Sequence, residues 1–128
     1  VIDQRVAERR VNHQFYKEIF KSHDGVQLFT EPSEDYQSNH WLNAIIIHPE
    51  KIGNKDREFW RLAFAEENIE TRPLWKPMHL QPLFANKMYF GANIAETLFN
   101  NGLCLPSGSN LTDDDKERIY KVIKKLIE

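Results

Sequence analysis

Apolar residues recur along the first twenty positions at the spacing of a helix. The stripe consists of Ile2, Val6, Val11, Phe15 and Ile19. Intervals of four and five residues predict a helix with one buried side, in register from the second residue. We expect it to end near Lys21, with Gly25 in the left-handed conformation that closes many helices. Since no capping residue precedes it, the chain is expected to begin inside a longer helix; a trimmed start of a small protein is the alternative.

Two apolar runs predict the first strands of a sheet. Val26–Thr30 is rich in β-prone residues and ends shortly before Pro32. Trp41–Ile47 is apolar on both faces apart from Asn43, which is typical of a central strand. The polar residues 33–39 between them suit a surface loop, so the two strands are expected to pair antiparallel.

A second helix is predicted by signals at both of its ends. Asn54 or Asp56 can cap its start, and Asn68 can close it in the left-handed conformation. Its predicted buried side consists of Phe59, Leu62, Ala63 and Glu66, widened by Trp60 and Phe64. The following residues, 69–72, are expected to be extended.

The last third of the chain adds two helices and a strand. A helix over about 93–101 ends at Gly102, and residues 103–105 form a short buried strand. Thr112 can cap the final helix, with Asp115 at the capping-box position. The predicted buried face of that helix consists of Ile119, Val122, Ile123 and Leu126. The element order predicts an α+β fold, a small antiparallel sheet with helices packed mainly on one face.

The segment Arg72–Pro82 contains three prolines and cannot form an α-helix. Each proline drives the residue before it toward extended geometry. The residues restricted in this way are Arg72, Lys76 and Gln81. A polar segment with so little freedom loses less entropy when it orders around a ligand, which indicates a preorganised binding loop. A solvated connector is the alternative.

Composition narrows the class of protein. The 128 residues fit one domain, with 41% hydrophobic and 28% charged residues, as in a folded globular protein. The net charge of −2 and the scattered basic residues argue against nucleic acid or an anionic membrane as partner. Cys104 has no cysteine to pair with, and the longest apolar run, 44–47, is too short to cross a bilayer. A reducing cytoplasm is the simplest compartment.

His79 is the main candidate for chemistry, because it lies in the proline segment and imidazole can donate, accept or titrate near neutral pH. Lys76 and Arg72 could together hold a phosphate or carboxylate. Trp75 is expected to pack on the core rather than stack on a ligand. The other histidines are His13, His23, His40 and His48. They are dispersed along the chain without the spacing of metal ligands, so no metal site is predicted.

Longer strings resemble a known family. The string ETRPLWKPMHLQP at 70–82 is followed by AETLF at 95–99 and GLCLPSG at 102–108. Together they resemble the carboxyl-terminal part of the DegT/DnrJ/StrS sugar aminotransferases, and the likeness extends from Arg5 to the final helix. The string WKPMHLQP is most similar to the branch that aminates a 4-keto group on UDP-linked N-acetylated dideoxy sugars.

This resemblance implies the small domain of the aspartate-aminotransferase fold, in a pyridoxal-phosphate enzyme that forms a homodimer. It implies a nucleotide-sugar substrate, an amino donor, and a role in bacterial surface or protein glycan synthesis. In the family, the aldimine lysine and most cofactor contacts belong to a preceding large domain, so no catalytic residue is expected here. The substrate-binding residues carried over by position are His79, Lys76, Gln81, Met78 and Arg72.

Two other functions are compatible with the same residues. The chain could be a noncatalytic interaction or regulatory module that keeps the fold and binds a partner through the proline segment. It could also be the small domain of a related nucleotide-sugar dehydratase, in which a histidine replaces the aldimine lysine.

Overall fold

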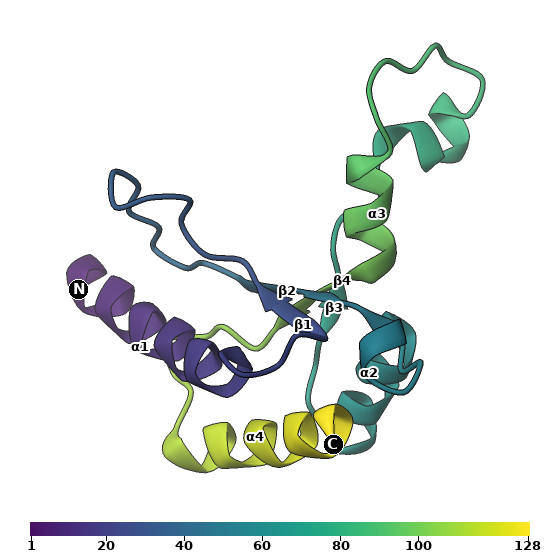
Figure 1. Ribbon diagram of the computed structural model, residues 1–128. Helices are drawn as coiled ribbons and strands as arrows, with labels where there is room; N and C mark the ends of the chain where they lie inside the picture. The colour runs from purple at the N-terminus through teal and green to yellow at the C-terminus, as the bar shows by residue number, and fades with distance from the viewer.

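A computed structural model describes residues 1–128 and contains one four-stranded sheet and four α-helices (Figure 1). The strands are β1 (Val26–Leu28), β2 (Asn43–Ile47), β3 (Arg72–Pro73) and β4 (Gly102–Leu105). They lie in the order β1-β2-β4-β3, and all neighbours are antiparallel. The predicted α+β fold and the pairing of the first two strands are confirmed, although β1 and β2 are shorter than predicted.

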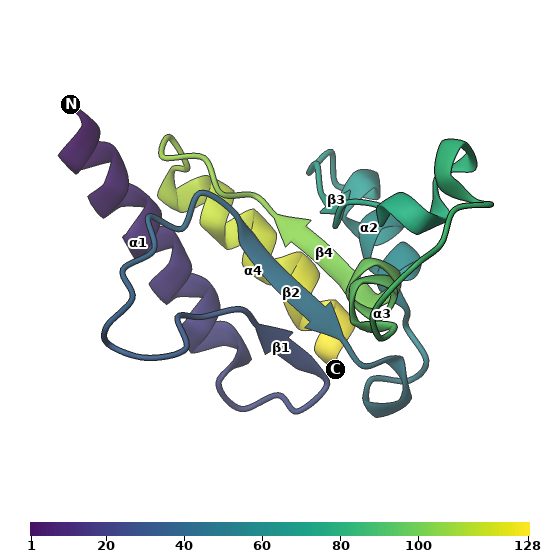
Figure 2. The same cartoon turned by 90° about the horizontal axis from the view of Figure 1, so that it is seen from above.

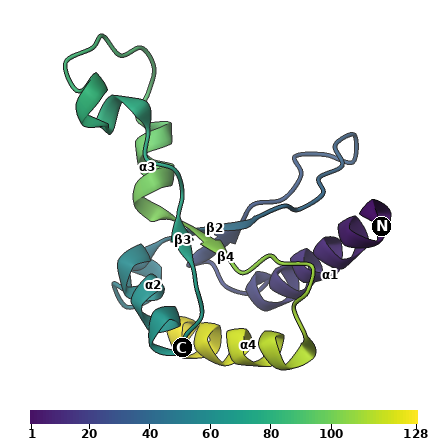
Figure 3. The same ribbon diagram turned by 180° about the vertical axis from the view of Figure 1, so that it is seen from behind.

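The helices gather mainly on one side of the sheet (Figures 2 and 3). Helices α1 (Ile2–Phe20) and α4 (Asp113–Ile127) lie below it in Figure 1, with α2 (Arg57–Glu66) beside α4, whereas α3 (Ile94–Asn101) projects from the other side. The largest core side chains between these layers are Tyr16, Phe20, Ile45, Ile47, Trp60, Phe64, Leu103, Ile119 and Ile123. No helix combines the length and apolar character needed to cross a membrane.

Helix α1 matches its predicted bounds but not its predicted buried stripe. Ile2 and Val11 are exposed, and the helix instead buries Asn12, His13, Tyr16 and Phe20. The expectation for Gly25 is also wrong, because it does not have a positive φ. A Cβ atom at this buried position would collide with Ile52, so close packing rather than left-handed geometry requires the glycine.

Helix α2 begins at the predicted cap and ends at the predicted turn. The Asp56 carboxylate accepts a hydrogen bond from the Phe59 amide at 2.8 Å, and Asn68 has a φ of 56°. The buried residues are Trp60 and Phe64, whereas Phe59 and Leu62 are about half exposed. The predicted stripe is therefore rotated relative to the core, which lies on the side of the helix that carries Trp60 and Phe64.

Helix α4 follows its local sequence closely. Thr112 accepts from the Asp115 amide, and Asp115 accepts in return from the Thr112 amide at 3.0 Å, which completes the capping box. That backbone hydrogen bond lowers the pKa of Asp115. The four predicted buried residues of α4 are all buried.

A buried polar network joins α1 to the sheet. Nδ1 of His13 lies 2.9 Å from Oδ1 of Asn43, the one polar residue of β2. Asn43 in turn donates through its backbone and side-chain nitrogens to Ser107 Oγ, at 2.8 and 3.1 Å. The Ser107 hydroxyl donates a hydrogen bond to the Leu105 carbonyl at 2.8 Å. These bonds satisfy polar groups that would otherwise destabilise the core.

Candidate substrate-binding arm

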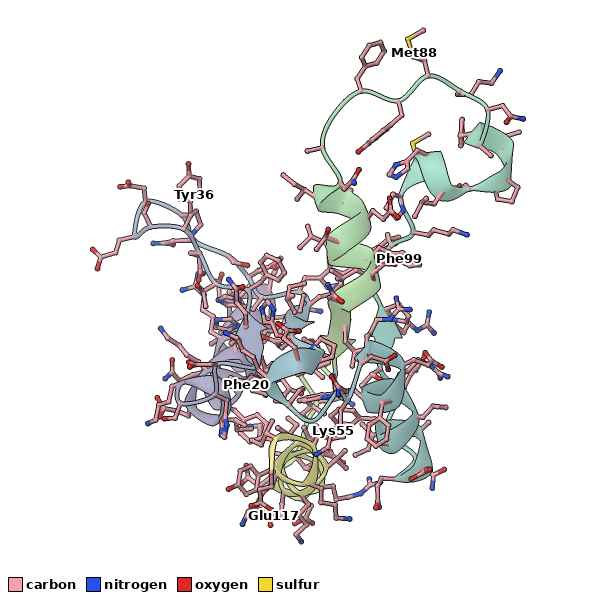
Figure 4. The ribbon with its side chains drawn as sticks, turned by 45° about the vertical axis from the view of Figure 1, so that its right-hand side comes forward. Phe20, Tyr36, Lys55, Met88, Phe99 and Glu117 are labelled. Atoms are coloured by element: carbon pink, nitrogen blue, oxygen red, sulfur yellow. The ribbon has the colours of Figure 1, made fainter.

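Most of the proline segment, residues 74–82, belongs to a long projection from the sheet, residues 74–101, which we call the arm. It connects β3 to β4, two adjacent antiparallel strands, so both of its ends are held at one edge of the sheet. Figure 4 shows Met88 at the far end of the arm and Phe99 near its base. The other extended segment, residues 29–42 with Tyr36 at its tip, also leaves the sheet on the side away from α4 (Figures 1 and 4).

Two short 3-10 turns form the outgoing half of the arm, η2 (Met78–Leu80) and η3 (Pro82–Phe84). No α-helix forms here, as predicted. Pro77 stands just before the first turn and Pro82 opens the second, where a missing N–H group leaves no hydrogen bond unmade. Gln81 is extended, with φ −82° and ψ 140°, as expected for a residue before proline.

His79 lies at the centre of η2 and faces the returning half of the arm. Its ring is 4.1 Å from the ring of Tyr89, centroid to centroid, and its Nε2 is 3.6 Å from Oε2 of Glu96. The side chain is 18% exposed. Tyr89 and Glu96 are ten and seventeen residues away in sequence, so the predicted loop alone gave no sign of these contacts.

Lys76, Gln81 and Met78 surround the same turn. The Gln81 side chain donates to the Lys76 carbonyl at 3.2 Å, which braces the turn, and the Lys76 side chain is left exposed. Met78 is 62% exposed. The structure therefore brings four of the five candidate residues into one turn of the arm.

Arg72 is placed differently from the other candidates. It lies in β3 at the foot of the arm, where it pairs with Cys104 of β4. Its guanidinium forms an exposed ion pair with Glu70, with Nη2 and Oε1 2.6 Å apart. Burial raises the pKa of the Cys104 thiol, so this side chain packs as a small buried hydrophobe and not as a reactive thiolate.

The arm exposes more large apolar side chains than any other part of the chain. The most exposed are Trp75, Met78, Leu83, Met88, Phe90 and Ile94. The prediction that Trp75 packs on the core is wrong, because it is 68% exposed; its ring centroid lies 6.2 Å from that of Trp41, which is also exposed. Apolar surface of this kind marks a binding or docking region.

Two of the dispersed histidines come together away from the arm. His13 and His40 stack with ring centroids 3.6 Å apart, and with Glu31 they place three possible metal-ligand atoms within 4.8 Å of one another. Ring nitrogens bind metal in the ring plane, so two parallel rings stacked face to face cannot both direct a lone pair at one ion. The arrangement fits a hydrogen-bonded stack better than a metal centre.

The lysines offer no site for an aldimine cofactor. A lysine that forms a Schiff base is usually desolvated or placed beside another cation. None of the ten lysines here is buried, and the half-buried Lys55 donates to the Leu126 carbonyl at 2.9 Å. The residues of this chain do not fit pyridoxal phosphate by themselves.

The fold is that of aminotransferases of known structure. The aminotransferase TlmJ from Streptoalloteichus hindustanus superposes with a TM-score of 0.80 at 18% identity, over 94% of this chain and 31% of that one. Residues 1–124 match the DegT/DnrJ/EryC1/StrS aminotransferase family, and the chain belongs to that family.

Two curated relatives align along nearly the whole chain. EpsN of Bacillus subtilis (strain 168), to which pyridoxal phosphate-dependent aminotransferase activity is attributed, is 38% identical over 98% of this chain and 32% of its own length. The GDP-perosamine synthase of Escherichia coli O157:H7 is 31% identical over 97% of this chain and 32% of its own length. The chain thus spans about a third of the curated relatives it matches.

Proposed function

We propose that this chain is the substrate-binding small domain of a pyridoxal-phosphate-dependent aminotransferase that acts on a nucleotide-linked 4-keto sugar. The observation that carries the proposal is the arm, which gathers His79, Lys76, Gln81 and Met78 in one turn on a family scaffold. The name of the E. coli relative, GDP-perosamine synthase, supports a nucleotide-linked sugar as the substrate class.

The cofactor and the aldimine lysine would belong to a preceding large domain, entered through α1. This division is supported by the absence of a buried lysine and by the chain's coverage of about a third of its relatives. Pyridoxal phosphate would act there as the electron sink for the transamination, with the amino donor and the sugar using the same site in turn.

The arm would form one wall of the substrate pocket. His79 and Gln81 can hydrogen-bond sugar hydroxyl or amide groups, and the exposed cation of Lys76 can meet a diphosphate. Arg72 would stabilise the foot of the arm through its ion pair with Glu70. Alternatively, this ion pair would open and the Arg72 guanidinium would bind the ligand. The exposed apolar side chains of the arm would pack against the large domain or the second subunit of a cytoplasmic homodimer.

The proposal is tested in the complete polypeptide that carries this chain, loaded with pyridoxal phosphate. Replacing His79 with alanine is expected to lower kcat/KM for the nucleotide keto sugar about ten- to a hundredfold, as for a lost hydrogen bond worth about 1.5–3 kcal/mol. The visible absorbance of the cofactor should not change, because His79 would contact substrate only.

A matched control is Lys121→Ala, a side chain exposed on α4 that pairs only with Glu117. It should leave kcat/KM unchanged. Unaltered kinetics in His79→Ala would remove His79 from the substrate site, and absence of transamination in the unaltered protein would refute the function itself.

A further inference from the structure

The surroundings of His79 distinguish its two ring nitrogens. Nε2 is buried and has no hydrogen-bond partner, although the carboxylate of Glu96 lies only 3.6 Å away. Nδ1 makes no hydrogen bond either, but it is not fully buried and so keeps contact with solvent. Nε2 is therefore the nitrogen shielded within the arm, and Nδ1 is the nitrogen that solvent can reach.

Glu96 and Tyr89 hold the ring from two directions. Tyr89 covers a face of the imidazole, with 30° between the ring planes, and its own hydroxyl donates to the Ala92 carbonyl at 2.8 Å. Glu96 lies in the first turn of α3, where the positive end of the helix favours a carboxylate. Both residues come from the returning half of the arm, so His79 is held where the two halves meet.

The contact between His79 and Glu96 is slightly longer than a hydrogen bond. A nitrogen donor and an oxygen acceptor bond at about 3 Å, so a small rotation of either side chain would close it. Hydrogen bonds in binding sites are often long without ligand and shorten in the complex. A carboxylate accepts hydrogen bonds and donates none, so closure requires the proton on Nε2.

We propose that Glu96 is a positioning residue for His79: it keeps the imidazole proton on Nε2 and leaves Nδ1 as an outward lone pair. That lone pair accepts a hydrogen bond from a hydroxyl or amide N–H group of the sugar ligand. The ligand role rests on the proposed function, whereas the coupling between Glu96 and His79 does not. Glu96 thereby acts through His79 and needs no contact with the substrate.

The coupling is tested by nitrogen-15 NMR of the histidine side chains in the 128-residue chain. We expect the proton of neutral His79 on Nε2, and slower exchange of that proton with water than for an exposed histidine. Glu96→Gln, which retains an acceptor oxygen, should preserve both signatures, and Glu96→Leu should abolish the slow exchange. Glu70→Gln is the control, because this carboxylate pairs with Arg72 at the foot of the arm.

The consequence for ligand binding is tested by a double-mutant cycle in the complete enzyme. If Glu96 acts through His79, Glu96→Leu lowers kcat/KM in the wild-type background but causes no further loss in His79→Ala. Additive losses, or a His79 proton unaffected by Glu96→Leu, would overturn the proposal. A third outcome separates the two parts of the proposal. If the NMR signature depends on Glu96 but His79→Ala leaves the kinetics unchanged, the coupling between Glu96 and His79 stands and only the contact of His79 with substrate is refuted.

Discussion

The imidazole of His13 lies parallel to that of His40, with planes inclined by 10° and centroids 3.6 Å apart. His40 Nε2 contacts Glu31 Oε1 at 3.0 Å, and Arg10 donates to the Ser38 carbonyl at 2.8 Å. The histidine stack and the Arg10 hydrogen bond connect the extended segment 29–42 to α1, and the contact between His40 and Glu31 braces the segment internally. The stack is one of few tertiary contacts that hold this segment, since most of its residues are exposed.

Stability should depend on pH through His40. Burial lowers the pKa of His40; His13 and Arg10 lower it further, and Glu31 opposes the shift. As pH falls below about 6.5, the usual value, the unfolded chain takes up a proton before the folded chain does. The free energy of unfolding is therefore highest above that pH and falls as pH drops toward the lowered pKa.

Urea denaturation at a series of pH values measures this dependence. His40→Asn should flatten it, and asparagine tolerates the φ of 46° found at this position. His48→Asn is the control, because His48 is more than a third exposed and outside the stack. Parallel pH profiles for the wild type and His40→Asn would contradict the prediction.

Arg57 of α2 binds the base of the arm through a hydrogen bond and a cation–π contact. Its Nη1 donates to the Phe99 carbonyl at 2.6 Å, and its guanidinium lies 5.1 Å from the centre of the Phe99 ring. Arg57→Ala should destabilise the chain by about 1.5–3 kcal/mol and speed amide hydrogen exchange across α3. Arg61→Ala, which removes a partly exposed pair with Glu58 on the same helix, should cost at most about 1 kcal/mol and leave α3 exchange unchanged.

Gly102 sets how closely α3 approaches the sheet. A Cβ atom there would collide with the Leu98 carbonyl and the Leu74 side chain, at the two ends of the arm. Gly102→Ala should destabilise the chain by about 1–3 kcal/mol and shift NMR signals throughout the arm. Gly53→Asn is the control: its surroundings are open, and asparagine accepts its φ of 67°. Equal thermal midpoints for both variants would show that the close approach is unimportant.

The capping box of α4 should contribute measurably to stability. Thr112→Ala removes the hydroxyl that accepts from the Asp115 amide and should lower the free energy of unfolding by about 1 kcal/mol. Thr112→Ser keeps the hydroxyl and should behave like the wild type in the same denaturation experiment. Equal losses in both variants would assign the effect to the methyl group instead of the cap.

Elements governed by neighbouring residues were predictable from sequence. Asp56 and Thr112 cap backbone groups within three positions, and Asn68 adopts a left-handed conformation itself, so both ends of α2 and the start of α4 follow from local residues. The faces of α1 and α2 were less predictable. Both helices carry apolar residues around more than half of their circumference, and packing against the sheet selected Tyr16, Phe20, Trp60 and Phe64.

The candidate site was likewise predictable from sequence only in part. The sequence by itself determined that residues 72–82 form a stiff polar segment, because proline restricts its own backbone and that of the residue before it. Only the tertiary structure decided that Glu96 and Tyr89 contact His79 and that His13 stacks on His40. Contacts between distant residues depend on how the sheet and the arm bring their backbones together, and no local preference specifies that geometry.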